Sequence, residues 1–398
     1  MKASRFAIVL AVAGLAWACS ISAAQEFADI PLTHPAIQYA RPTNDPIARL
    51  LRNPEAMNRL VSRGPSGYLR SILDALAVPV ESQILVFSKG SLQSALINAA
   101  NPRALYFNDS VAVGWVRGGL IEIAAQDPSQ GTVFYLADPG TKVISRADGT
   151  CLSCHFSYRT DGVPGMIERM GHTRPLEERW GGWYVTGTLA PREHFGNVAD
   201  VFKAPGGAPP ALVSLEKTFD VNGYLTPYSD IAALLVFEHQ MQMMNLLVRL
   251  GWEARVARHE GRLDGRQAAL QESVDRLVDH MLFVDEAPIA SPIEGSSGFA
   301  RVFSSRGPRD ASGRSLYQLD LTTRVLRYPC SYMIYSAQFE ELTAEAKAAV
   351  YRRLWAVLSG AATDARYRRL SLANRRAIVE ILRATKPALP DGFGPVVR

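Results

Sequence analysis

The sequence predicts an α+β fold, in which an antiparallel β-rich N-terminal half and a helical C-terminal half flank a loop-rich middle. Three observations carry this prediction. Between residues 82 and 137, short β-rich runs alternate with turn clusters of Gly, Asn and Asp. Residues 156–228 are rich in Gly, Pro and aromatic residues, and from residue 229 onward apolar residues recur at helical spacing. The predicted regions of the chain are 1–24, 25–150, 151–228 and 229–398.

The N-terminal region is expected to contain two helices followed by a β-meander. The helices lie near 46–61, where Pro46 suits a first helical turn, and near 66–76. Short turn clusters between the strands favour antiparallel neighbours. The predicted strands are 84–87, 104–107, 111–116, 120–124 and 132–136.

The C-terminal region is expected to be helical. Ser229 is a suitable N-cap for its first helix, and residues 285–315 form a Gly-, Ser- and Pro-rich loop. The predicted helices are 231–257, 262–283, 344–358 and 372–384.

The overall composition is that of an ordinary packed globular protein. Of 398 residues, 47% are hydrophobic and 20% are charged, which excludes a collagen, a coiled coil or a long disordered tail. The 43 Lys and Arg against 38 Asp and Glu leave a net charge of +5, too small to indicate nucleic acid as a partner.

Residues 1–24 have the pattern of a secretory signal peptide. Lys2 and Arg5 precede an apolar run over 6–18, and small residues before Gln25 suit cleavage after Ala24. The protein is therefore expected to be periplasmic or secreted.

Cys19 leaves open a lipoprotein, with a lipid attached at that cysteine, although the bulky Trp17 suits a lipoprotein signal poorly. No run of about 18 apolar residues follows residue 24, so no membrane span is expected in the mature chain.

Residues 151–155 contain the motif that carries chemistry. Cys151, Cys154 and His155 form C-x-x-C-H, the attachment signature of a c-type haem. On one helical turn the two thiols project along one edge and can form thioethers with the two vinyl groups of a porphyrin, while the imidazole reaches the iron. Because c-type haem is attached outside the bacterial cytoplasm, the export signal supports one covalent haem c, with 151–228 as the region that holds and wraps it.

Two other interpretations of the cysteine pair remain open. A thioredoxin-like redox dithiol would require a long helix after the motif, where the chain instead has the breaker-rich segment 160–165. A zinc site would require two further ligands at matching spacing, and no second C-x-x-C occurs.

The segment 151–155 resembles the attachment motif of c-type cytochromes. The resemblance implies thioether bonds at Cys151 and Cys154 and proximal iron ligation by His155. Small class I cytochromes have a helix before the motif and a distal methionine a few tens of residues after it, and this chain has neither. Residues 178–184 and 327–332 also look like segments of an uncharacterised group of exported bacterial monohaem proteins, a likeness that implies no particular activity.

The sixth iron ligand is predicted from nearby donors. His172, Met166 and Met170 lie in the loop that leaves the motif and could return to the opposite haem face. His239 lies on an apolar helical face, where a histidine is more often a satisfied core residue than a ligand or a distal acid–base group.

Several side chains are expected around the haem. Trp180 and Trp183 are expected to form a pocket wall, and Arg174, Arg179 and the segment at His194 could contact the propionates.

Three further residues are expected to have no role at the iron. His259 and His280 lie among charged helical residues and are predicted at the surface, while Cys330 is predicted as a buried, inert thiol.

The best functional hypothesis is electron transfer with a periplasmic redox partner protein. An alternative is a haem enzyme with an open sixth position, such as a peroxidase or other small-ligand oxidoreductase acting on a small oxidant. A third possibility is a haem-carrying subunit or sensor of a larger complex. No catalytic residue can be named from the sequence.

Overall fold

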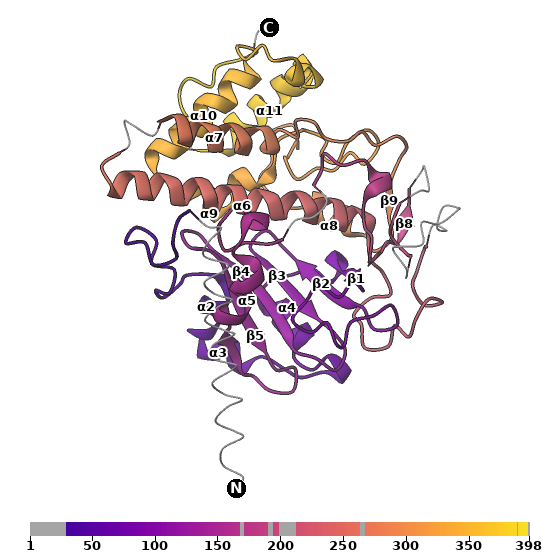
Figure 1. Cartoon of the computed structure of the whole chain (residues 1–398). Helices are drawn as coiled ribbons and strands as arrows, with labels where there is room; N and C mark the ends of the chain where they lie inside the picture. Colours follow the sequence, from indigo (N-terminus) through magenta and orange to yellow (C-terminus); the bar gives the residue numbers. More distant parts are fainter. Residues whose placement is uncertain are drawn as a thin grey trace.

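A computed structural model describes residues 29–167, 171–189, 194–198, 212–262, 267–387 and 389–396. The β-sheet forms the lower half of the molecule, and the C-terminal helices are stacked above it, with the long helix α6 (Ile231–His259) between the two (Figure 1). The predicted α+β class is therefore confirmed. The predicted signal peptide, with Cys19, lies outside the described residues, as does Met170.

The main sheet is antiparallel and has the strand order β6-β5-β4-β3-β2-β1-β7. Its strands are β1 (Ile84–Val86), β2 (Arg103–Phe107), β3 (Val111–Trp115), β4 (Ile121–Asp127), β5 (Gly131–Ala137), β6 (Ile144–Arg146) and β7 (Trp183–Tyr184). Each of the five predicted strands is present, and the meander is confirmed. The sequence analysis missed β6 and β7, since runs of two or three residues carry no periodic signal.

Two short helices stand where one was predicted over 46–61. They are α2 (Pro46–Leu51) and α3 (Pro54–Asn58). Pro54 has no amide hydrogen to continue a helix, and the Asn53 side chain accepts a hydrogen bond from Ala56 N to begin the second one. α2 and α4 (Leu69–Ala75) cover one face of the sheet, where their apolar residues join a buried cluster with the strands.

Helix α6 covers the opposite face of the sheet. Its N-cap is Asp230, whose side chain accepts hydrogen bonds from Ala232 N and Ala233 N. The prediction of Ser229 as N-cap was wrong, because the Ser229 hydroxyl donates to Tyr184 O and accepts from Leu85 N. Ser229 thus joins the start of α6 to strands β7 and β1.

Helix α6 is apolar over most of its surface. It is the one helix among the described residues that is long and apolar enough to cross a membrane by length and composition. Of its most apolar window, 94% is buried inside the protein, and a core position accounts for such a composition. The sequence had been expected to contain no apolar run of about 18 residues after residue 24, and α6 is an exception to that expectation.

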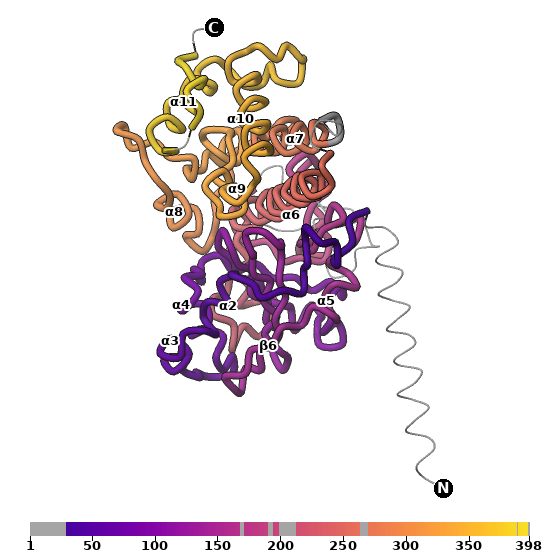
Figure 2. Tube along the Cα trace, turned by 90° about the vertical axis from the view of Figure 1, so that its left-hand side faces the viewer, coloured from indigo at the N-terminus to yellow at the C-terminus, as the bar shows by residue number. Residues whose placement is uncertain are grey.

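The remaining C-terminal helices pack around α6 (Figure 2). They are α7 (Gln267–Met281), α8 (Phe299–Ser304), α9 (Ala337–Glu340), α10 (Ala344–Leu358) and α11 (Leu372–Thr385). The bounds predicted for α10 are confirmed, and those predicted for α11 differ by one residue. In the predicted loop 285–315 the structure has α8 and the strand β9 (Glu294–Gly295), which pairs with β8 (Gly187–Thr188).

The middle region has little regular structure in its described parts, as predicted. It contains the end of the short helix α5 (Asp148–His155), the strands β7 and β8, and the short 3-10 helices η3 (Tyr158–Thr160) and η4 (Leu176–Glu178). The other 3-10 helices are η1 (Gly64–Ser66), η2 (Val80–Ser82), η5 (Tyr332–Tyr335) and η6 (Ala365–Arg369).

Candidate functional site

The C-x-x-C-H residues lie on the short helix α5 (Asp148–His155). Asp148 stands in its first turn, where a carboxylate suits the positive end of the helix dipole. Arg146 pairs with this carboxylate, and Tyr39 donates a hydrogen bond to it over 3.2 Å. These contacts fix the start of the helix against the sheet.

Both motif thiols are free. Cys154 is exposed and Cys151 is half-buried. Both residues lie on α5, and residues three apart lie on the same side of a helix, so Cys151 and Cys154 leave α5 on one face. Burial, and then the charge of Glu122, raises the pKa of Cys151 to about 12. Cys151 is therefore a protonated thiol at neutral pH, which is the opposite of an activated redox dithiol.

The imidazole of His155 has one nitrogen engaged and one free for a ligand. Its Nδ1 lies 2.8 Å from the carbonyl oxygen of Gly165. Because a carbonyl only accepts, Nδ1 carries the hydrogen and Nε2 keeps its lone pair. Burial lowers the pKa of His155, so the ring is neutral. A neutral imidazole held through its other nitrogen is the usual form of a metal-ligating histidine.

Helix α6 holds the segment that orients His155. The side chain of Asn245 accepts a hydrogen bond from Met166 N over 3.0 Å and donates one to Met166 O over 2.7 Å. Gly165 N in turn donates to His155 O over 2.9 Å. A Cβ added at Gly165 would lie 2.2 Å from Asn245 Oδ1, so any larger residue would displace the Asn245 side chain from its present position.

The sheet surface beside α5 is half-buried and is lined by small residues. A cross-strand row runs from Phe107 through Ala112 and Ala124 to Phe134. Phe107 contacts Phe237 of α6, with ring centroids 4.7 Å apart, and Phe134 contacts the ring of His155 at 4.8 Å. The two alanines between them are partly exposed. These two small, partly exposed side chains thus lie between the part of the sheet under α6 and the part under α5.

An arginine stands next to this row. Arg103 of β2 pairs with Glu122 of β4 at 2.5 Å and lies over Gly114, where an added Cβ would come within 2.6 Å of the guanidinium. The Nε of Arg103 is buried and has no acceptor within the described part of the chain. Sequence reasoning missed Arg103, because a lone arginine in a strand carries no signal before the pairing is known.

Of the predicted distal ligands, the structure brings His172 and His239 together. The side chain of Met166 is partly buried against the main hydrophobic core, and Met170 lies outside the described residues. His172 and His239 face each other, with their Nδ1 atoms 3.4 Å apart. Asn245, which holds the His155 side, is six residues further along α6 than His239, or about 240° around the helix axis. His239 and Asn245 therefore leave α6 in different directions.

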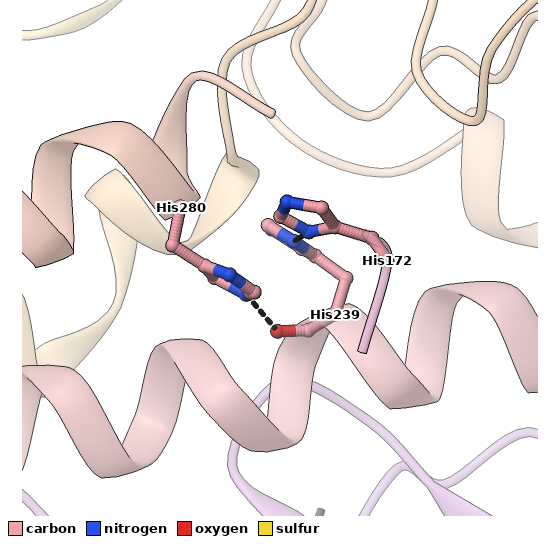
Figure 3. Close-up of side chains that lie close together, drawn as sticks. All are labelled: His172, His239 and His280. Carbon is pink, nitrogen blue, oxygen red and sulfur yellow. Dashed lines mark hydrogen bonds between the residues drawn. The ribbon is translucent and has the colours of Figure 1, made fainter. Parts of the chain in front are cut away.

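His280 of α7 completes a cluster with these two histidines (Figure 3). One ring nitrogen of each of His172, His239 and His280 lies within 4.8 Å of the others. The prediction that His280 is a surface residue was wrong, since its ring stacks on His172 at 4.2 Å and on His239 at 4.8 Å. Burial holds the pKa of His172 and His239 well below the usual range and lowers that of His280 to about 4. All three rings are neutral near pH 7.

A buried ion pair ties the loop of His172 to α6. Arg179 and Glu238, exposed by only 2% and 3%, are paired at 3.1 Å. Arg179 also donates to His172 O over 3.0 Å, and Trp180 Nε1 donates to Glu238 over 2.8 Å. The Arg179 guanidinium is thus committed to the protein itself.

The other predicted pocket residues are distributed over this region. Trp180 is fully buried, with its ring 5.5 Å from that of the buried His194, and Trp183 is partly buried against the same core. Arg174 is exposed beside Glu178. Cys330 is a buried thiol with a pKa raised to about 12 by burial, as predicted, and His259 is exposed, as predicted.

Comparisons with known protein-family models, with curated proteins and with solved structures found no match to this chain. The functional interpretation therefore depends on the chemistry of two groups of residues. One is the motif on α5 and the half-buried sheet surface beside it, and the other is the histidine cluster on the far side of α6.

Proposed function

We propose that this chain is an exported monohaem c-type protein that transfers electrons. Haem c would be attached through Cys151 and Cys154, with His155 as the proximal iron ligand. The observation that carries the proposal is the hydrogen bond from His155 Nδ1 to the Gly165 carbonyl. It leaves Nε2 as the only nitrogen that can bind iron, next to two free thiols on one helical face.

The residues beside α5 fit a large apolar plate. Across the row from Phe107 to Phe134, three inter-strand spacings of about 4.8 Å span roughly 14 Å. Ala112 and Ala124 have short side chains that project little from the sheet, so that a flat group could lie above them. Arg103 Nε is a buried donor without an acceptor, which suits a propionate carboxylate.

The haem, when bound, supplies one-electron chemistry at its iron. The protein's own residues would perform the supporting tasks. The thiols fix the group covalently, the Gly165 carbonyl orients the imidazole, and the sheet excludes water from one face. Electron transfer requires only such a fixed group and an exposed edge through which a partner protein can approach, and the exposure of Cys154 supplies that edge.

A redox dithiol fits the same residues less well, because an activated cysteine needs a lowered pKa and that of Cys151 is raised.

A second candidate function is a small-ligand oxidoreductase, such as a peroxidase, with an open sixth position. One observation favours it. His172 and His239, two of the four predicted distal ligands, face each other and His280 on the far side of α6 from the motif. In this arrangement neither is directed to the proposed haem as a sixth iron ligand.

The deciding experiment uses the full chain, produced with haem-attachment machinery. Acid–acetone extraction should leave the colour on the protein, and Cys151→Ala or Cys154→Ala should abolish or reduce it. Cys330→Ala is the matched control and should leave the haem content unchanged. A colourless parent protein, or complete extraction of the haem, contradicts the proposal.

The ferric spin state separates the two candidate functions. A low-spin parent indicates a sixth protein ligand and supports electron transfer. A high-spin parent that binds cyanide or peroxide supports the small-ligand oxidoreductase instead.

A further inference from the structure

Three imidazoles converge between α6, α7 and the loop that follows the motif. His239 comes from α6, His280 from α7 and His172 from the loop, and one ring nitrogen of each lies within 4.8 Å of the other two (Figure 3). We infer that this cluster binds one transition-metal ion of the zinc–copper class, at a site separate from the C-x-x-C-H motif. The inference does not rest on the proposed haem function.

The hydrogen bonds around the cluster engage the Nε2 atoms of His280 and His239, which leaves the Nδ1 atoms of these two residues as candidate ligand atoms. His280 Nε2 lies 3.2 Å from the carbonyl oxygen of His239, which can only accept, so the lone pair of His280 is on Nδ1. His239 Nε2 lies 2.8 Å from Ser331 Oγ, and its Nδ1 faces His172. The Nδ1 atoms of His172 and His239 are then 3.4 Å apart, close to the separation of two ligand nitrogens about 2.0–2.1 Å from one zinc ion.

The partners of these histidines have the character of an outer coordination layer. Ligating histidines almost always hydrogen-bond through their second nitrogen to a carbonyl, carboxylate or similar group, which fixes the ring orientation. Ser331 and the His239 carbonyl supply such partners here. Arg179 donates a hydrogen bond to His172 O and pairs with Glu238, which directly precedes His239 on α6. The ion pair therefore fixes the backbone positions of His172 and His239 relative to each other.

The cluster is enclosed by aromatic rings. Phe283 stacks on His239 at 4.0 Å and on His172 at 5.1 Å, and Tyr332 lies 6.4 Å from His239. His239 and His172 are exposed by only 1% and 3%, whereas His280 is half-buried. An ion would therefore enter past His280 and keep its open coordination position on that side.

The donor set determines the class of metal. Within the described residues the cluster offers three neutral imidazoles and neither a carboxylate nor a thiolate. Imidazole nitrogens suit zinc and copper, whereas calcium and magnesium require oxygen ligands. Three histidines with an open fourth position form a ligand set that zinc adopts in proteins. Zn²⁺ and Cu²⁺ share this chemistry, and they are distinguished by measurement.

The test uses the full mature chain, treated with a chelator, which does not remove covalently held haem. Titration with Zn²⁺ alone and with Cu²⁺ alone, followed by calorimetry, should show one equivalent bound per chain. Metal analysis of the protein as produced identifies the natural ion, and the electron paramagnetic resonance spectrum of the copper form should report nitrogen ligands.

Two variants assign the site. His280→Gln is the mildest change, because the side chain is half-buried, and it should weaken Zn²⁺ binding roughly 100-fold or more, beyond the effect of losing an outer partner. Ser331→Ala removes such a partner and should weaken binding about 10–100-fold. Circular dichroism and the unfolding temperature verify that both variants are folded.

His259→Ala is the matched control. His259 is exposed on α6 and contacts His34 edge to face, with ring centroids 5.6 Å apart, so it belongs to another close histidine pair near this helix. Its replacement should leave binding unchanged. The inference is overturned if the parent binds neither ion, which would make the cluster a hydrogen-bonded core triad. It is overturned equally if His280→Gln binds as the parent does, or if His259→Ala abolishes binding.

Discussion

The two sides of helix α6 differ in how completely their side chains are buried. On the sheet side, Asn245 clamps the segment that orients His155, and the neighbouring sheet surface is half-buried and floored by alanines. On the helical side, His239 and His172 are almost completely buried under Phe283. The proposed haem would lie on the first side, and the proposed metal ion on the second.

The difference follows from what each side packs against. A β-sheet offers a broad surface whose height is set residue by residue, so two alanines in one row suffice to leave a space. Helices α6 and α7 interdigitate along their length, and a space between them is no larger than the side chains that line it. One core helix can therefore serve two sites of different scale.

The largest expected effect is the loss of the proposed haem site on the sheet side, without a change in zinc binding on the helical side. Replacing both Cys151 and Cys154 with Ala should abolish covalent haem and reduce the yield of folded protein, because a bound group stabilises only the folded state. The loop 156–228 should become sensitive to limited proteolysis, while zinc binding per folded chain stays unchanged. If the loop remains as resistant as in the parent, the haem is peripheral to the architecture. Loss of zinc binding would show that the two sides are coupled.

The second prediction concerns the exclusion of water from the buried carboxyl group of Glu286. Glu286, exposed by 6%, has a pKa raised from 4.5 to about 7 by burial, and its side chain accepts a hydrogen bond from Val325 N. A raised acid pKa means that stability is highest below pH 4.5 and falls as the pH rises through 7. The predicted loss is about 3 kcal/mol.

Glu286→Gln keeps the acceptor and removes the charge, so its unfolding free energy should fall less between pH 5 and 8 than that of the parent. Denaturant unfolding at several pH values measures the difference. Parallel curves for the two proteins would mean that water reaches Glu286.

The third prediction tests the clamp between α6 and the motif. Gly165→Ala places a methyl group 2.2 Å from Asn245 Oδ1, so the Asn245 side chain must shift and its hydrogen bonds to Met166 are expected to weaken or break. The expected cost is about 2 kcal/mol of unfolding free energy, as for buried polar groups left unsatisfied. The environment of the His155 ring should change in the haem spectrum. Gly392→Ala, at a glycine with open space around it, is the control and should be neutral. An unchanged spectrum in Gly165→Ala would separate the clamp from His155.

The smallest expected effect comes from a helix cap remote from both proposed sites, and it serves as a control for general destabilisation. Ser371 caps α11 by accepting a hydrogen bond from Asn374 N over 3.2 Å. Ser371→Ala should cost about 1 kcal/mol in chemical denaturation and alter neither haem content nor zinc affinity. A change in either binding property would mean that general destabilisation, rather than local geometry, governs both sites.

The features that sequence patterns predicted are local ones. The bounds of α10 and the five strands depend on periodicity within one segment, and they were predicted closely. The motif on α5 is also local, since its residues lie within a single helical turn. The half-buried surface next to it was not predictable, because Ala112 and Ala124 form one row only after the strands have paired.

His280 shows why the histidine cluster could not be predicted. It is 41 residues from His239, which is itself 67 residues from His172, so no spacing connects the three. Its neighbour Asp279 suggested a surface position, but in the structure Asp279 pairs with Arg366 and accepts a hydrogen bond from Tyr367. The local charge is neutralised by residues far away in the chain. The prediction of the N-cap of α6 was wrong for a similar reason. Ser229 and Asp230 are equally suitable N-cap residues until the contacts of Ser229 with the strands are known.

The composition of α6 has a consequence for an exported chain. If the chain is exported as proposed, a segment as apolar as α6 would pass through the translocation channel before its burial partners exist, and it would risk being released sideways into the lipid as an anchor. Polar residues near its middle oppose that release, and a charged side chain at the centre of such a segment costs roughly 3 kcal/mol on insertion. They are Glu238, His239, Gln240, Gln242 and Asn245. The groups that hold His155 and build the histidine cluster would thus also keep the nascent helix moving through the membrane instead of stopping in it.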